Sequence, residues 1–151
     1  MRAVTIYTDG GCQPNPGLGG WGAIVVDDAT KETIELYGGE RDSTNNRMEL
    51  TASLVALRSL PERTAVTIFT DSQYQRDGIT KWVAGWRKKG WKTADRKDVK
   101  NRDLWEALDA ECGRHAVIWK WVRGHAGDVY NERADALATQ GRRLAVNPRV
   151  A

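Results

Sequence analysis

The sequence contains few cysteines and no long apolar segment. Its two cysteines, Cys12 and Cys112, lie in dissimilar contexts without the short paired spacing of a zinc site, so we expect reduced thiols. No apolar run approaches the roughly 20 residues that a transmembrane helix requires. The N-terminus lacks the charged and apolar regions of a secretory signal peptide. These absences predict a soluble, cytoplasmic protein that does not enter a membrane.

Positive charge is concentrated in one part of the chain. Between residues 81 and 100, eight basic residues stand against two aspartates, so this segment carries +6 and the remainder −3 of a net charge of +3. The segment also contains Trp82, Trp86 and Trp91, and exposed tryptophans favour stacking on bases or packing on sugars. We interpret this predicted basic loop as a contact for nucleic acid; a plain solvated face is the alternative.

A six-residue sequence occurs twice, as VTIYTD at residues 4–9 and as VTIFTD at residues 66–71. Each copy is typical of a β-strand because it is rich in β-branched and aromatic residues. The copies end in Asp9 and Asp71. If the two strands are adjacent and parallel, the carboxylates meet, and their repulsion favours a bound cation that prefers oxygen ligands. The alternative is that each aspartate only begins a turn, as Asp-Gly and Asp-Ser often do.

The order of the predicted elements favours a single α/β domain over residues 1–151. Strands joined by short turns are antiparallel, whereas strands reached through helices run parallel and cross over right-handedly. The prediction is a mixed five-stranded sheet in the order 3-2-1-4-5, with helices on both faces and a ligand site at the switch point. The predicted strands are residues 2–8, 20–26, 34–39, 66–71 and 117–122; the predicted helices are residues 48–57, about 73–83, about 102–112 and about 131–144, with a flexible tail from about 145.

Two further carboxylates interrupt apolar helical patterns. Glu49 is the only charged residue between Arg47 and Arg58 and falls on the core-facing stripe of its predicted helix. Because a buried carboxylate without a partner is costly, Glu49 either joins the two strand aspartates in a metal site or is satisfied by Arg47 or the helix dipole. Asp135 repeats the pattern in the last helix. His125, in a glycine-containing loop upstream of it, is a candidate for proton transfer near neutral pH.

Taken together, these residues resemble the bacterial type 1 ribonucleases H. The resemblance runs from Ala3 to about Ala138 and rests on YTDGGCQPNPG, TNNRMEL, TDSQY, ITKWV…W.KKGWK and RGHAG…NERAD, all present in that order. It implies a ribonuclease H-like fold and an enzyme that hydrolyses the RNA strand of RNA/DNA hybrids, leaving 3′-hydroxyl and 5′-phosphate ends with little sequence specificity. It also implies a monomer in which Mg²⁺, or Mn²⁺ as a substitute, is bound by four acids: Asp9, Glu49, Asp71 and Asp135.

The resemblance also implies substrate contacts. Four residues would contact the hybrid across its minor groove, namely Cys12, Asn15, Asn45 and Gln73. Four others would hold the DNA strand, namely Trp82, Lys88, Trp91 and Asn101. His125 would assist proton movement or product departure without binding metal, and Asp128 stands where some relatives carry a second histidine. Two rival functions are a DNA strand transferase on the same fold and a non-catalytic hybrid-binding module.

Overall fold

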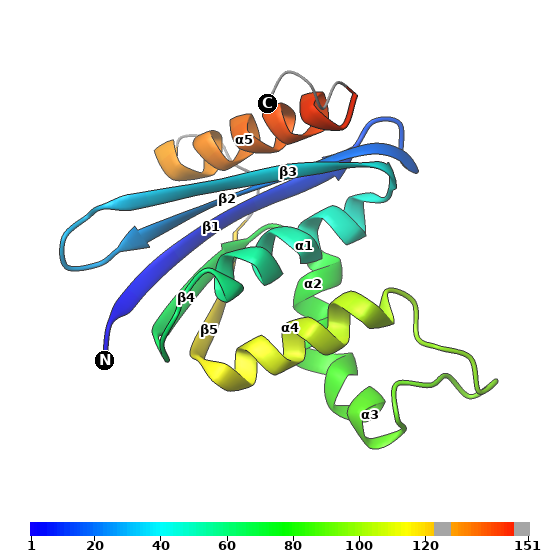
Figure 1. The fold of residues 1–151 in the computed structure, drawn as a ribbon. Helices are drawn as coiled ribbons and strands as arrows, with labels where there is room; N and C mark the ends of the chain where they lie inside the picture. The colour runs from blue at the N-terminus through cyan, green and yellow to red at the C-terminus, as the bar shows by residue number, and fades with distance from the viewer. Residues whose placement is uncertain (123–127, 147–151) are drawn as a thin grey trace.

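A five-stranded mixed sheet forms the centre of the structure, a computed structural model that describes residues 1–122 and 128–146 (Figure 1). The strands are β1 (Ala3–Cys12), β2 (Gly17–Asp27), β3 (Thr33–Ser43), β4 (Ala65–Thr70) and β5 (Ala116–Trp121). Their order is β3-β2-β1-β4-β5, which confirms the predicted order. Strands β1 to β3 are antiparallel, while β4 is parallel to both β1 and β5, so the switch point falls between β1 and β4.

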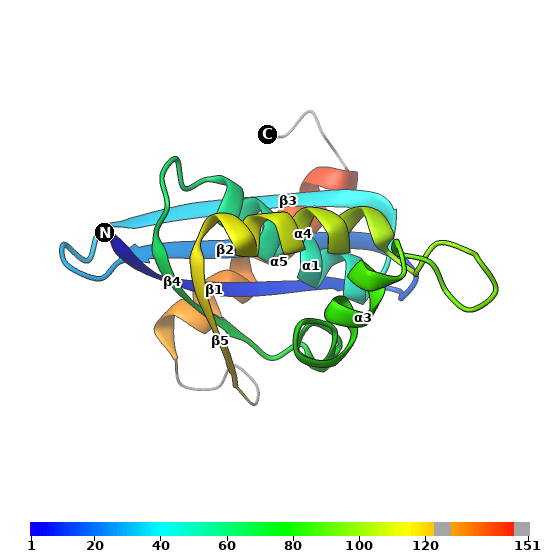
Figure 2. The same cartoon turned by 90° about the horizontal axis from the view of Figure 1, so that it is seen from below.

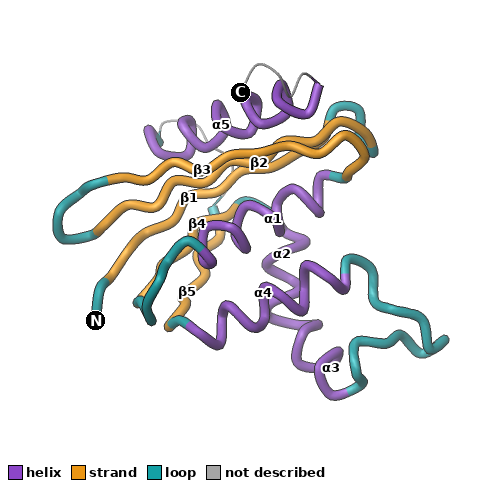
Figure 3. The backbone as a smooth tube through the Cα atoms, viewed as in Figure 1, coloured by secondary structure: helices purple, strands orange, loops and turns teal. Residues whose placement is uncertain are grey.

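Helices cover both faces of the sheet, as predicted (Figures 1 and 2). Helices α1 (Asn45–Arg58), α2 (Gln73–Asp77) and α4 (Arg102–Arg114) lie on one side, and α5 (Val129–Val146) lies alone on the other. The tube in Figure 3 shows the same two helical layers with the sheet between them. None of the helices in the described part of the chain is both long and apolar enough to cross a membrane.

The repeated hexapeptides form the parallel pair at the centre of the sheet. Val4 pairs with Val66, and the register continues without a shift to Tyr7 and Phe69. The even-numbered apolar residues of both strands are buried in the main core beneath α1. On the opposite face, the rings of Tyr7 and Phe69 stack with centroids 5.2 Å apart. The register therefore brings the two aspartates that follow to the same end of the strand pair.

The first three strands extend further than predicted. The β1–β2 ladder continues past Asp9 through Gly10 and Gly11 to Cys12, whereas the sequence prediction ended the first strand at Thr8. Glycines are poor strand formers, so the sequence pattern placed a break there. In the structure, the absence of a side chain on Gly10 allows the backbone of α1 to approach β1 closely.

The predicted basic loop at residues 81–100 is partly helical. The chain continues from α2 through a π-helical turn, η1 (Gly78–Trp82), into α3 (Val83–Lys88), so the loop proper covers only residues 89–101. Trp86 is not an exposed stacking platform; it packs against Trp105, with ring centroids 5.6 Å apart. Packing of this partly buried indole against the core stabilises helical structure beyond the predicted end at Val83.

Helix α5 rests directly on the backbone of β2 and β3. A Cβ on Gly39 would lie 2.1 Å from the carbonyl oxygen of Gly141, and a Cβ on Gly141 would lie 1.9 Å from the carbonyl oxygen of Gly38. Real contacts of this kind are never so short, and backbone atoms cannot move aside as a flexible side chain can. The distance of α5 from the sheet, and hence the position of Asp135 on it, depends on these missing side chains.

Gly39→Ala is expected to destabilise the protein by about 1–3 kcal/mol, because the new methyl group must push α5 away from the sheet. Gly85→Ala is the matched control: no atom lies within 4 Å of its added Cβ, and its helical position predicts a gain of about 0.5–1 kcal/mol. Chemical denaturation measures both free energies of unfolding. Equal changes in the free energy of unfolding of the two variants would contradict the close packing of α5 on Gly39.

Candidate active site

Three acidic side chains converge where β1 separates from β4. Ligand oxygens of Asp9, Glu49 and Asp71 all lie within 4.8 Å of one another. Asp9 lies two residues beyond the last β1–β4 pair, Tyr7 with Phe69, and Asp71 directly follows the end of β4. Glu49 lies near the start of α1. We call these three residues the carboxylate cluster; it occupies the switch point of the sheet, where open α/β sheets bind ligands.

Glu49 is the most strongly perturbed member of the carboxylate cluster. Its side chain is nearly buried, with 9% of the residue exposed, and its Oε2 has no hydrogen-bond partner. Burial raises the pKa of Glu49 well above its usual value, and the charges of Asp9 and Asp71 raise it further. A hydrogen bond from the Gly10 backbone only partly offsets these effects. An orphaned oxygen among like charges fits a site built for a divalent cation.

A glycine on β1 brings Glu49 close to the strand. A Cβ on Gly10 would lie 2.5 Å from the carbonyl carbon of Met48 and 2.7 Å from the backbone nitrogen of Glu49. The first turns of α1 therefore pack directly on the β1 backbone beside Asp9. The N–H of Gly10 also donates to Asp9 Oδ1 at 2.9 Å, which orients this carboxylate. Gly10 thus positions two of the three acids.

Arg47 is not the partner of Glu49, so that alternative from the sequence is wrong. Its guanidinium forms a bidentate pair with Asp103, at 2.9 and 3.0 Å, and donates to Asn101 Oδ1 at 3.1 Å. The side chain therefore reaches from α1 to the start of α4 and away from the carboxylate cluster. Sequence reasoning missed this link because Arg47 and Asp103 are 56 residues apart.

Asp135, the fourth predicted acid, lies on α5 beside the carboxylate cluster but outside it. Its side chain is exposed and lines a pocket of about 220 Å³ together with Asp9. His125 lies outside the described residues. Asp128 has a structural role, because its Oδ1 accepts the backbone N–H groups of Tyr130 and Asn131 at the start of α5. This capping arrangement helps to begin the helix that carries Asp135.

Three of the residues predicted to contact the minor groove form one hydrogen-bonded chain. The N–H of Cys12 donates to Asn45 Oδ1 at 2.6 Å, and the N–H of Asn45 donates to Asn15 Oδ1 at 3.1 Å. Both amide oxygens point into the protein, so both NH₂ groups are oriented by the structure. Gln73, the fourth residue, is exposed at the first position of α2, two residues after Asp71. These amides lie in the loops and helix ends that adjoin the carboxylate cluster.

Both cysteines are free thiols, as expected. Burial raises the pKa of Cys12 and raises that of Cys112 to about 12. Neither thiol is activated as a nucleophile, because reactive cysteines have depressed pKa values.

The predicted contacts for the DNA strand differ in their surroundings. Trp82 is 36% exposed and Lys88 is exposed, whereas Trp91 is half-buried with its ring 6.3 Å from that of Trp86. Asn101 is bonded within the protein: its Oδ1 accepts from Arg47, and its Nδ2 donates to the hydroxyl of Tyr74 at 3.1 Å. Asn101 therefore joins the loop to α1 and α2, a role that its sequence context did not indicate.

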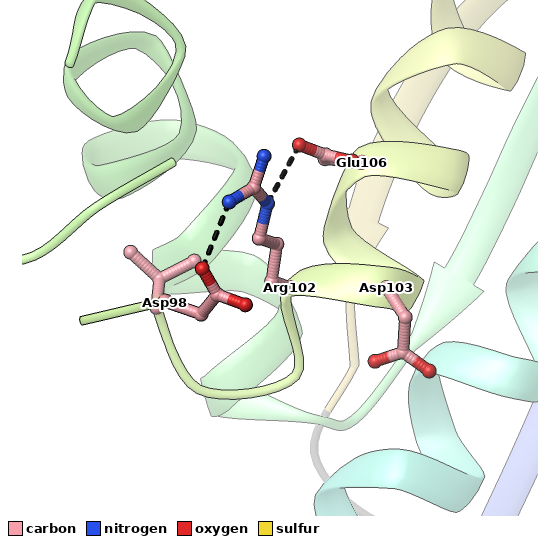
Figure 4. Close-up of a pocket in the computed structure, with 5 residues that line it drawn as sticks. Asp98, Arg102, Asp103 and Glu106 are labelled. Atoms are coloured by element: carbon pink, nitrogen blue, oxygen red, sulfur yellow. Dashed lines mark hydrogen bonds and ion pairs between the residues drawn. The ribbon is translucent and has the colours of Figure 1, made fainter. Parts of the chain in front are cut away.

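Acidic residues partly neutralise the basic segment. A pocket of about 430 Å³ at the start of α4 is lined by Asp98, Val99, Arg102, Asp103 and Glu106 (Figure 4). Arg102 lies between two of these acids and donates to Asp98 at 2.8 Å and to Glu106 at 2.9 Å. Lys92 also pairs with Asp98. Two acids outside the segment also pair with its basic residues, Asp77 with Lys81 and Asp109 with Arg87, so the charge of +6 counted along the sequence is not all available to a polyanion.

Comparison with known proteins identifies the family. The sequence model of the family described as RNase H matches residues 1–143. The chain belongs to the ribonuclease H family. A ribonuclease H from Chelativorans sp. (strain BNC1) is 59% identical over 141 residues, covering 93% of this chain and 86% of that protein.

Solved structures of ribonucleases H show the same fold. LC9-RNase H1 is 33% identical with a TM-score of 0.83, covering 95% of this chain and 73% of that chain. LC11-RNase H1, solved in complex with an RNA/DNA hybrid, is 20% identical with a TM-score of 0.70, covering 95% and 99%. Family membership confirms the enzyme predicted from the sequence, a ribonuclease H that degrades RNA in RNA/DNA hybrids. The three carboxylates of the cluster lie close enough together to hold a divalent metal ion.

In the presence of a chelator at neutral pH, Glu49→Gln is expected to raise the midpoint of thermal unfolding. The substitution removes a carboxyl group whose ionised form is disfavoured by burial and by the charges of Asp9 and Asp71. In a chain of this size, each kcal/mol gained corresponds to about 2–4 °C. Folding raises the pKa of Glu49 above its value in the unfolded chain, about 4.3. The folded state of the wild type therefore loses stability as the pH rises from the unfolded-state pKa through the folded-state pKa. The advantage of the variant should therefore disappear below about pH 4.

Glu62→Gln is the control for this measurement, because Glu62 is exposed and its substitution should leave the midpoint unchanged. Added Mg²⁺ should raise the wild-type midpoint more than that of Glu49→Gln, since a ligand stabilises the folded state that binds it. A lower midpoint for Glu49→Gln than for wild type in chelator would contradict the description of Glu49 as an uncompensated buried acid.

Proposed function

We propose that this ribonuclease H binds Mg²⁺ through Asp9, Glu49, Asp71 and Asp135 and uses it to hydrolyse the RNA strand. The observation that carries the proposal is the carboxylate cluster, three acids within 4.8 Å with one buried oxygen that has no protein partner. An all-oxygen donor set favours Mg²⁺, with Mn²⁺ able to substitute. Bound divalent ions would polarise the phosphoryl group, favour deprotonation of the attacking water and stabilise the leaving 3′-oxygen.

The position of Asp9 supports a role as the shared ligand. It belongs to the carboxylate cluster with Glu49 and Asp71, and it also lines the pocket that contains Asp135. Asp9 would therefore hold divalent metal together with Glu49 and Asp71, and also together with Asp135. His125 would move a proton or assist product departure without binding metal, as the family resemblance implies.

The amides beside the carboxylate cluster support recognition of the RNA strand. Asn15 and Asn45 each use their side-chain oxygen within the protein, so their NH₂ groups can donate to 2′-hydroxyls in the minor groove. Gln73 and Cys12 lie in the same region, next to Asp71 and Asn45 respectively. Selectivity for a hybrid would follow, because a DNA strand in this position lacks the hydroxyl groups.

The aromatic and basic residues near α3 support a contact with the DNA strand. Trp82 offers an exposed ring that can pack against deoxyribose, and Lys88 offers an exposed charge for phosphate. Trp91 is held by its contact with Trp86, and Asn101 holds the loop through Arg47 and Tyr74. Contacts to sugars and phosphates carry no direct sequence information, so cleavage by a monomer with little sequence preference is expected.

Asp9→Asn should abolish most hydrolysis of an end-labelled RNA/DNA hybrid in Mg²⁺. Loss of a shared metal ligand removes several kcal/mol of transition-state stabilisation, and about 4 kcal/mol corresponds to roughly a 10³-fold lower rate. Wild type should leave 3′-hydroxyl and 5′-phosphate ends, and removal of divalent ions should stop the reaction. Glu32→Gln, which removes an exposed carboxylate from the β2–β3 turn, should retain full activity. Full activity of Asp9→Asn, strand joining, or binding without cleavage by wild type would each refute the proposal.

Asn45→Asp tests recognition of the RNA strand separately from chemistry. Aspartate keeps the oxygen that accepts from Cys12 but replaces the outward NH₂ donor, so KM for the hybrid should rise about tenfold while kcat changes little. Asn46→Asp adds the same charge one residue away, where no hydrogen bond is lost among the described residues, and should change KM far less. Equal effects of the two substitutions in steady-state kinetics would show that charge alone, and not the amide donor, determines the change.

A further inference from the structure

A groove runs along α5 from the acidic residues to an arginine. Its helical wall consists of four residues at spacings of three, four and seven, which place them on one face of α5: Asp135, Ala138, Thr139 and Arg142. The facing wall consists of Asp9, Gly10, Gly11 and Gly20 from β1 and β2. This pocket of about 220 Å³ is therefore acidic at the Asp135 end and basic at the Arg142 end.

Arg142 is held in place by its backbone, while its guanidinium has no ion pair or hydrogen bond within the described part of the chain. A Cβ on Gly20 would lie 2.5 Å from the backbone nitrogen of Arg142 and 3.0 Å from its Cα. This close packing fixes the residue against the β1–β2 hairpin. Arg133, on the same helix, is instead paired with Glu35 at 2.6 Å. Arg142 thus offers its hydrogen-bond donors to a ligand in the groove, whereas Arg133 does not.

The charge of Arg142 acts on the end of β1. Burial raises the pKa of the Cys12 thiol most, and the charge of Glu40 also raises it, whereas Arg142 lowers it as the smallest effect there. A polyanionic substrate that approaches Asp9 and Asp135 is repelled by their carboxylates. A cation in the same groove counters that repulsion without occupying the position of a metal ligand.

We propose that Arg142 binds a phosphodiester group of the substrate strand, next to the one that is cleaved. This inference rests on the proposed function. The planar guanidinium matches a phosphate with two parallel hydrogen bonds. Seven residues of helix place the Cα of Arg142 about 10 Å from that of Asp135, so the phosphate it binds is a neighbour of the reacting group on the same strand. Arg142 is a substrate-binding residue that extends the site along α5.

The test compares Arg142→Gln with Arg143→Gln, which removes the same charge from the next residue of α5, an exposed position that does not line the pocket. Hydrolysis of the hybrid is measured over a series of KCl concentrations at constant Mg²⁺. Binding of the hybrid is measured in the same series with Asp71→Asn as the inactive background. Arg142→Gln should lower kcat/KM about tenfold at low salt, mainly through KM. It should also reduce the slope of log binding constant against log salt by about 0.7–0.9, the loss of one phosphate contact.

Arg143→Gln should stay within about twofold of wild type with an unchanged salt slope, and Arg142→Lys should recover part of the loss because lysine keeps the charge without the planar fork. Thermal unfolding of each variant checks that it folds. If Arg142→Gln does not fold, Arg142→Lys is compared with Arg143→Gln instead. Equal salt slopes for Arg142→Gln and Arg143→Gln, or a fall in kcat alone, would overturn the role of Arg142. Failure of wild type to cleave the hybrid would instead refute the proposed function.

Discussion

The repulsion among three carboxylates held within 4.8 Å of one another dominates the electrostatics of the active site. Asp9, Glu49 and Asp71 cannot all be ionised in this space at low cost, and the raised pKa of Glu49 expresses that cost. Without a cation, this repulsion therefore lowers the stability of the folded state. A bound divalent ion would reverse the balance, because the same oxygens would become its ligands and the orphaned Oε2 of Glu49 would gain a partner.

The scaffold holds the acids together through backbone packing more than through side-chain interactions. The unshifted register of β1 and β4 fixes the two aspartates, and the missing side chain of Gly10 lets α1 bring Glu49 against β1. On the other face, Gly39 and Gly141 set the distance of α5. An acid whose backbone is fixed by such packing cannot move away from the neighbouring carboxylates. This rigidity is what a preorganised metal site requires.

Much of this arrangement could be predicted from the sequence because it follows from local patterns. The repeated hexapeptide identified the central strand pair, and a lone Glu49 in an apolar helical stripe indicated the third acid. The partners of Arg47 and Asn101 could not be predicted, since their contacts join elements more than 25 residues apart. The same reason accounts for Trp86, whose sequence context suggested a stacking platform and whose ring packs on Trp105. The predicted strand ends were wrong at glycines, because the sequence pattern shows the low strand preference of glycine but not the helix that packs against it.

Crystallographic location of Mn²⁺ by anomalous scattering tests whether the carboxylate cluster binds a divalent metal. Crystals of the wild-type protein soaked in Mn²⁺ should show a strong anomalous peak in direct contact with carboxylate oxygens of Asp9, Glu49 and Asp71 together. Absence of a peak at this position, with the three carboxylates ordered and Mn²⁺ bound elsewhere, would contradict the assignment of the cluster as the metal site.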